Sequence, residues 1–71
     1  MKNVLVIGST GQIGSELTMK LRNMIPDGNI VAGYIPGAEP KGILLESGPA
    51  EEANVKNAQQ LADIVEKYKI D

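Results

Sequence analysis

The fold is decided by one stretch near the start of the chain, Val4-Leu5-Val6-Ile7-Gly8-Ser9-Thr10-Gly11-Gln12-Ile13-Gly14. Its first four residues form an unbroken apolar run in which three side chains are β-branched. Such a run predicts a strand of a parallel sheet covered on both faces, because a half-exposed strand would alternate polar and apolar residues. Three glycines follow at a spacing of three, which predicts a tight turn into a helix.

Beyond the glycines, the apolar residues take up the spacing of a helix. Over residues 12–24 they are Ile13, Leu17, Leu21 and Met24, which share one face. Pro26 ends this helix, and Asp27-Gly28 supplies a turn. Strand, turn and helix together form the first half of a βαβ unit.

The rest of the chain continues the alternation of strands and helices. We expect a second strand over residues 30–35, parallel to the first because crossover connections are right-handed. A long loop over residues 36–49 follows, with room for a helical turn over 42–46. A weak edge strand over 51–55 precedes a helix over 58–69, capped by Asn57. The predicted fold class is α/β, a partial Rossmann-like, doubly wound parallel sheet in the order β-α-β-loop-β-α.

Length and composition limit the number of domains and the kinds of metal or catalytic site that the chain can form. Seventy-one residues allow one small domain. The absence of Cys and His excludes a disulfide framework, thiolate or imidazole metal sites and a Ser-His-Asp triad. We interpret the acidic residues 46–52 as a solvated loop, and no metal site is assigned.

Charge and hydropathy limit the partners. A formal charge of −2 and 3% aromatic residues argue against nucleic-acid binding. The chain has no apolar run long enough to span a membrane, and the run that stops at Ile7 is too short for a signal peptide. We therefore expect a cytoplasmic location and no membrane partner.

Each glycine of the turn has a distinct predicted role. Gly8 can adopt the backbone angles of the tight turn, and Gly14 lets the helix approach the strand closely. Gly11 leaves space for an anion beside the backbone. The alternative is that the three glycines only form a tight turn. A nucleoside-triphosphate loop is disfavoured, because Ser15-Glu16 follows in place of Lys-Ser/Thr.

The backbone around this turn predicts an anion site. The free N–H groups of Gln12 and Ile13 lie at the positive end of the helix dipole, which suits a pyrophosphate. Ser9 and Thr10 can add hydroxyl donors to phosphate or ribose oxygens. The stretch therefore predicts binding of a dinucleotide.

These residues carry a family resemblance. The glycine turn, the helix that follows it and Ser47-Gly48-Pro49 resemble the N-terminal segment of the extended short-chain dehydrogenase/reductase superfamily. Within it, the similarity is to the NAD-dependent epimerase/dehydratase group, which includes short-chain L-threonine 3-dehydrogenases. The resemblance implies that Gly8, Gly11 and Gly14 bind the pyrophosphate of NAD, with backbone donors from Gln12 and Ile13.

Two positions depart from the family's pattern. Many NAD-using members end the second strand in an Asp that binds the adenosine ribose, whereas this chain has Gly33-Tyr34. Tyr34 is thus either a ribose contact or a packing residue. The nearby charges are Glu39 and Lys41, so NADP is not excluded, although the resemblance favours NAD. Asn54 stands where the family has an Asp that meets adenine; its carbonyl can accept the same hydrogen bond, or it is a turn residue.

The resemblance implies that the catalytic residues lie outside this chain. The family catalyst is a Tyr-x-x-x-Lys pair, but Tyr34 is followed four residues later by Ala38, and Tyr68 is followed at once by Lys69. No catalytic residue is assigned. We expect residues 1–71 to be the truncated N-terminal part of the dinucleotide-binding domain of an NAD-dependent dehydrogenase or epimerase.

The apolar edge of the first strand predicts a homo-oligomer, because an unpaired strand edge is a template for another chain. Ile70-Asp71 would begin a further strand. The alternative function is a non-catalytic Rossmann-like module that self-associates and binds no cofactor.

Overall fold

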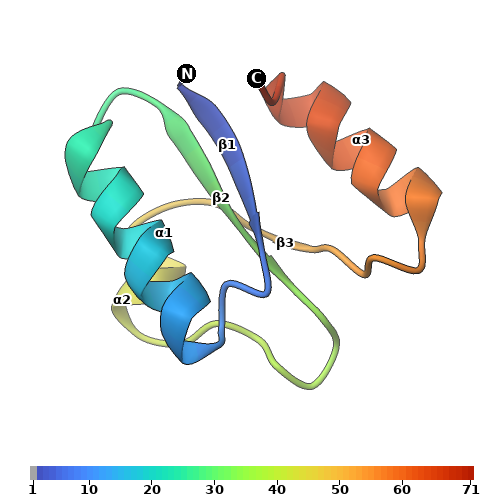
Figure 1. The fold of residues 1–71 in the computed structure, drawn as a ribbon, viewed down its shortest axis with the longest axis horizontal. Coiled ribbons are helices and arrows are strands. Elements are labelled where there is room, and N and C mark those ends of the chain that lie inside the picture. Colours follow the sequence, from blue (N-terminus) through green and yellow to red (C-terminus); the bar gives the residue numbers. More distant parts are fainter. Residues whose placement is uncertain (1) are drawn as a thin grey trace.

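The computed structural model describes residues 2–71 and has the predicted α/β architecture, with a three-stranded parallel sheet between helices (Figure 1). The elements are β1 (Asn3–Ile7), α1 (Gln12–Met24), β2 (Asn29–Tyr34), α2 (Ile43–Glu46), β3 (Ala50–Glu52) and α3 (Ala58–Tyr68). The element order and the helical turn in the long loop are confirmed. The third strand is wrongly bounded by the sequence: it was expected over residues 51–55 but spans Ala50–Glu52, a strand too short to leave a periodic pattern.

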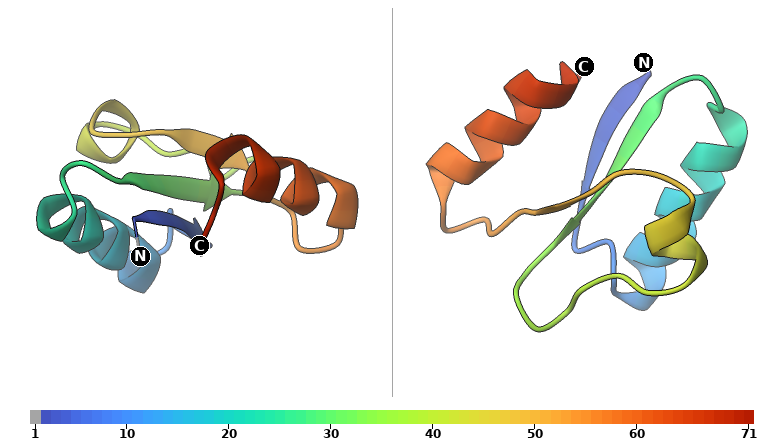
Figure 2. Two further views of the ribbon diagram at one scale, coloured as in Figure 1. Left: turned by 90° about the horizontal axis from the view of Figure 1, so that it is seen from above. Right: turned by 180° about the vertical axis from the view of Figure 1, so that it is seen from behind.

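The strands lie in the order β1-β2-β3, so their carboxyl ends meet at one edge of the sheet. Ile7 pairs with Gly33, and Tyr34 pairs with Glu52. Viewed along the sheet, α1 and α3 lie on opposite faces (Figure 2). The glycine turn therefore begins at the same edge at which β2 and β3 end.

Each face of the sheet has its own buried residues. On the α3 face, Val31, Ala53 and Ile64 form a buried cluster against which Leu5, Leu61, Tyr68 and Ile70 pack. Because strand side chains alternate between faces, Val6, Ile30 and Ala32 face α1. All three are buried, so β2 is covered on both faces. The sequence predicts such cover for the first strand, but in β1 only Val6 is buried and Ile7 is 45% exposed.

Helix α1 does not bury the apolar stripe that its sequence predicts. Ile13 is 82% exposed, Leu17 46% and Met24 65%, so these side chains face away from the sheet. Thr18 is fully buried, and its hydroxyl donates to the Gly14 carbonyl at 2.7 Å. The close approach at Gly14 turns this small-residue face toward the sheet, which rotates the larger apolar side chains outward.

One arginine joins α1 to the long loop. The Arg22 guanidinium donates to the carbonyls of Ile30 (2.9 Å), Leu44 (2.6 Å) and Pro49 (2.7 Å). Partial burial lowers its pKa from the ordinary value. A Cβ on Gly48 would lie 2.5 Å from the Arg22 Nε, so this glycine leaves space for the guanidinium. Arg22 thereby fixes the path of the chain from α2 into β3.

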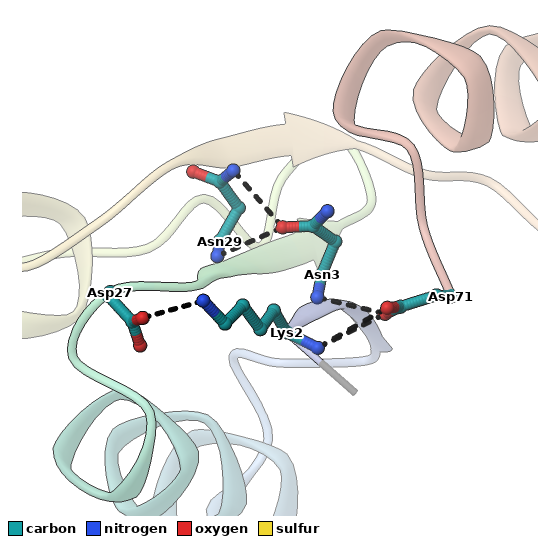
Figure 3. Close-up of polar contacts among 5 residues, drawn as sticks. All are labelled: Lys2, Asn3, Asp27, Asn29 and Asp71. Carbon is teal, nitrogen blue, oxygen red and sulfur yellow. Dashed lines mark hydrogen bonds and ion pairs between the residues drawn. The ribbon is translucent and has the colours of Figure 1, made fainter.

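The end of the chain lies along the outer edge of β1 (Figure 3). The Asp71 amide donates to the Asn3 carbonyl at 2.9 Å, and the Asp71 carboxylate accepts from the amides of Asn3 (2.9 Å) and Lys2 (3.2 Å). Nearby, the Lys2 ammonium pairs with Asp27 at 2.7 Å. Asp71 thus occupies the first position of a ladder beside β1, at the place where the sequence predicts a further strand to begin.

Helix α3 begins and ends as its sequence predicts. The Asn57 side chain accepts a hydrogen bond from the Gln60 amide at 3.0 Å, which caps the first turn. Lys69, with a φ of 52°, ends the helix in the left-handed conformation. Among residues 2–71, no helix has both the length and the apolar character needed to cross a membrane.

Candidate functional site

The glycine turn joins β1 to α1 at the carboxyl edge of the sheet. Gly8 has a φ of 72°, which L side chains rarely adopt, and its carbonyl accepts from the Gly11 amide at 3.2 Å. Helix α1 then begins, with the Ser15 amide donating to the Gly11 carbonyl at 2.8 Å. The turn therefore has the tight geometry that the sequence predicts.

The glycines of the turn differ in what requires them. Gly8 is needed for its positive φ. Gly14 is needed for packing, because a Cβ there would overlap the Gly8 carbonyl oxygen. Gly11 has a φ of −72°, and its nearest neighbour for a Cβ is the Gly8 oxygen at 3.5 Å, an ordinary contact. Neither the backbone angle nor the packing of the described residues explains a glycine at position 11.

The amino-terminal end of α1 is open. Gly11 is its N-cap and supplies no side-chain hydrogen bond, and the first turn holds no acidic residue. Gln12 and Ile13 are exposed, and within residues 2–71 their amides have no hydrogen-bond acceptor. Helix α3 differs, because Asn57 caps it. Unpaired amides at the positive end of a helix dipole attract anions, so this end of α1 can hold a phosphate group.

The two hydroxyl residues of the turn are placed differently. Ser9 is fully buried, and both its amide (3.0 Å) and its hydroxyl (2.9 Å) donate to the Gly33 carbonyl. A contact from the Ser9 hydroxyl to a phosphate would require this second bond to break. Thr10 is half-buried, and its predicted role as a hydroxyl donor stays a prediction. No local sequence pattern predicts the hydrogen bonds from Ser9 to Gly33, since they form only when β1 pairs with β2.

Tyr34 ends β2 at the carboxyl edge and is half-buried. Its side chain lies on the α1 face, because strand side chains alternate and Val31 faces α3. Its hydroxyl makes no hydrogen bond within residues 2–71. The structure therefore places Tyr34 on the same edge and face as the glycine turn.

Asn54 lies in the turn between β3 and α3. Its side-chain oxygen accepts from the Lys56 amide at 2.9 Å, and its amide donates to the Gln60 side chain at 2.8 Å. These bonds give Asn54 the role of a turn residue. Its side-chain oxygen keeps a second lone pair, so an additional contact to adenine stays a prediction.

Two hollows of the described surface lie away from the glycine turn. One of about 230 Å³ lies between β3 and α3, and its lining residues are Glu51, Glu52, Gln60, Asp63, Ile64 and Lys67. A wider one of about 630 Å³ lies beside α1, and its lining residues are Met19, Lys20, Arg22, Asn23 and Ser47. Neither includes the open end of α1, where Gln12 and Ile13 are exposed.

Known proteins resemble this chain over its whole length. No family model matches it. An uncharacterised epimerase/dehydratase of Staphylococcus saprophyticus is 35% identical over all 71 residues, and another from Staphylococcus haemolyticus is 34% identical. The X-ray structure of L-threonine dehydrogenase from Clostridium difficile superposes with a TM-score of 0.80 at 38% identity, again over the entire chain. Over its whole length the chain is therefore similar to a segment of proteins of the epimerase/dehydratase superfamily.

The similarity to this superfamily includes every candidate residue, because it extends over 100% of the chain. The glycine turn, Tyr34 and Asn54 all lie within the matched region. The chain spans 22% of the length of these epimerase/dehydratase relatives and of the threonine dehydrogenase.

Proposed function

We propose that residues 8–14 bind the pyrophosphate of a nicotinamide dinucleotide, as the cofactor-binding segment of an NAD-dependent dehydrogenase or epimerase. The family resemblance favours NAD as this dinucleotide. One observation carries this proposal: Gly11 caps an open helix end although the chain's own backbone and packing do not require a glycine there. A side chain at Gly11 would stand where an anion approaches the backbone. Because glycine has no side chain, an anion can approach the backbone at this position closely.

The rest of the turn suits the same ligand. The exposed amides of Gln12 and Ile13 can donate to phosphate oxygens at the positive end of the α1 dipole. In open α/β sheets, ligands bind at the carboxyl ends of the strands, where this turn lies. The adenosine would then extend over the ends of β2 and β3, toward Tyr34 and Asn54.

The nicotinamide ring supplies hydride transfer when the cofactor is bound. The residues of this chain bind and orient: the α1 end holds the pyrophosphate, and the Ser9–Gly33 bonds hold the turn against β2. No residue of the chain is assigned the acid–base step.

A titration tests the proposal. We expect NAD to shift the backbone amide resonances of residues 8–14 in the folded chain, and Gly11→Leu to abolish these shifts because the side chain blocks the anion. Ala62→Leu is the matched control, since it adds apolar bulk at an exposed position of α3. A flat response of the wild-type chain to millimolar NAD, or unchanged binding by Gly11→Leu, would contradict the proposal.

The outer edge of β1 favours a second candidate, self-association of a non-catalytic module. The backbone N–H and C=O groups of Asn3 point away from β2, because both form hydrogen bonds with Asp71. Backbone groups alternate between the two edges of a strand, so those of Leu5 and Ile7 also face outward, and β2 is the one strand that pairs with β1 within residues 2–71. The exposed Ile13, Leu17 and Met24 of α1 add apolar surface.

Sedimentation over a wide concentration range tests this candidate. We expect the mean mass to rise with concentration while the Leu5 and Ile7 amides gain protection from hydrogen exchange. A constant monomer mass with unchanged exchange of both amides would exclude it.

A further inference from the structure

The carboxyl end of β2 is the place at which a dinucleotide site of this kind distinguishes its two cofactors. An acidic residue there hydrogen-bonds the 2′-hydroxyl of NAD, whereas a nearby arginine accommodates the 2′-phosphate of NADP. In this chain the end of β2 is tied to the glycine turn, because Ser9 donates twice to the Gly33 carbonyl. The next residue, Tyr34, therefore lies beside the adenosine ribose if the pyrophosphate sits on α1.

The Tyr34 side chain is a phenol whose hydroxyl makes no hydrogen bond within residues 2–71. A phenol can donate to a ribose hydroxyl or to a phosphate oxygen, and it can accept from a ribose hydroxyl. Unlike a carboxylate, it does not repel a 2′-phosphate. Unlike a guanidinium, it does not offer that phosphate a paired charge. Tyr34 thus suits both ligands to a similar degree.

Two carboxylates near this edge each accept one hydrogen bond from another residue of the chain. The Glu39 side chain accepts from the Gly37 amide at 2.8 Å, which folds it back onto its loop. Glu52, which pairs with Tyr34 across the sheet, accepts from the Gln60 side chain at 2.7 Å. Each bond engages one carboxylate oxygen, and neither carboxylate stands at the last position of β2, which Tyr34 occupies.

The one arginine of the chain is also engaged. The Arg22 guanidinium donates to the carbonyls of Ile30, Leu44 and Pro49, at the opposite end of β2 from Tyr34. It cannot pair with a 2′-phosphate at the carboxyl edge while these bonds persist. In the loop over residues 36–49, the one cationic residue is Lys41, and it is exposed.

We propose that Tyr34 is the specificity-determining residue of the adenosine site and that this site accepts NADP as readily as NAD. The proposal rests on the proposed dinucleotide function and deepens it. It differs from a site with an acid at this position, which would favour NAD through the 2′-hydroxyl and repel the 2′-phosphate.

The test compares the two cofactors on the folded 71-residue chain. We expect NAD and NADP to shift the amides of residues 8–14 with dissociation constants within about a factor of three, less than the tenfold that corresponds to about 1.4 kcal/mol. Tyr34→Asp installs a carboxylate, and we expect it to move the ratio of the two constants toward NAD by about tenfold or more. Tyr34→Asn removes the ring without adding charge, and its ratio is expected to stay within about threefold of the wild-type ratio.

The outcomes separate this inference from the function beneath it. If neither cofactor binds the wild-type chain, the dinucleotide function itself falls, and the inference with it. If both bind but the wild-type constants differ by about tenfold or more, the function stands and the inference is wrong. This comparison needs no variant, so a failure of Tyr34→Asp to fold leaves it decisive. A folded Tyr34→Asp that leaves the ratio unchanged also overturns the inference.

Discussion

A Cβ on Gly14 would overlap the carbonyl oxygen of Gly8 and lie 2.9 Å from its carbonyl carbon, so the first turn of α1 is in direct backbone contact with the end of β1. This contact determines how the helix lies on the sheet, and it leaves the amides of the preceding residues at the open edge. It also separates the glycines that the fold requires from the one that a ligand would require.

Replacing these glycines by alanine should therefore have unequal effects on stability. Gly14→Ala is expected to lower the free energy of unfolding by about 1 to 3 kcal/mol, because the methyl group forces α1 away from Gly8. Gly11→Ala should lower it by less than about 1 kcal/mol, since its Cβ meets an ordinary contact and only an N-cap preference is lost. Urea unfolding measures both. Equal losses in the two variants would refute the distinction.

Arg22 is predicted to be the principal polar support of the loop between β2 and β3. Arg22→Met keeps much of the apolar stem but removes the donor to the Leu44 carbonyl and one of the two donors to the Pro49 carbonyl, which keeps its bond from the Ala32 amide. We expect a loss of about 2 to 3 kcal/mol in the free energy of unfolding. Lys20→Met, at an exposed position of the same helix, is the control and should change it by less than about 0.5 kcal/mol. A loss no greater than the control's would show that the network contributes little.

Stability should depend on pH through Glu51. Its carboxylate accepts from the Lys67 ammonium at 2.8 Å and from the Tyr68 hydroxyl at 2.6 Å, and these bonds hold the pKa of Glu51 below its ordinary value of 4.5. The unfolded chain therefore binds more protons just below pH 4.5, so the stabilisation is complete above that value and is lost as the pH falls through the folded pKa.

The measurement compares Glu51→Gln with the wild-type chain by urea unfolding across this range. We expect the variant to be less stable by about 1 kcal/mol at neutral pH and the difference to vanish in acid. Glu66→Gln is the control, because the Glu66 carboxylate makes no hydrogen bond within residues 2–71, and its difference should be small at every pH. A Glu51→Gln difference that persists unchanged in acid would rule out the carboxylate as its source.

Ser9→Ala tests whether this hydroxyl supports the turn or contacts the cofactor. The variant loses the buried bond from the Ser9 hydroxyl to Gly33, and we expect about 1 kcal/mol less stability. The Ser9 amide still donates to the same carbonyl, so the turn keeps its shape and NAD titration should give an unchanged dissociation constant. Weaker NAD binding by a variant whose turn is intact would instead assign the hydroxyl to the ligand.

Local signals were sufficient to predict most elements of the fold. The apolar run before Gly8, the helix cap at Asn57 and the breaks at Pro26 and Gly28 act over a few residues, and the structure has the corresponding elements. The third strand was less well predicted, because a strand of three residues leaves almost no periodic pattern. The Asp71–Asn3 pairing was anticipated only as the start of a strand, without its partner.

The candidate site, too, was predicted from the sequence only in part. The sequence predicted the glycine turn and its open helix end, but it assigned the Ser9 hydroxyl to a ligand. It also did not predict the contacts of Arg22. Both side chains bind carbonyls of residues far along the chain, on β2 and beside β3, and such partners become neighbours only when the strands pair.

The sequence by itself determined the succession of strands and helices and the location of the glycine turn, because strand periodicity, helix caps and glycine turns depend on neighbouring residues. Tertiary structure alone decided which face of α1 meets the sheet. Periodicity favours Ile13, Leu17 and Met24, yet Gly14 and Thr18 face the sheet, because the backbone contact between Gly14 and Gly8 sets the rotation of the helix. Gly14 predicts that the helix approaches the strand closely, but a contact between two backbones leaves no apolar periodicity, so the sequence pattern does not show which face of α1 meets the sheet.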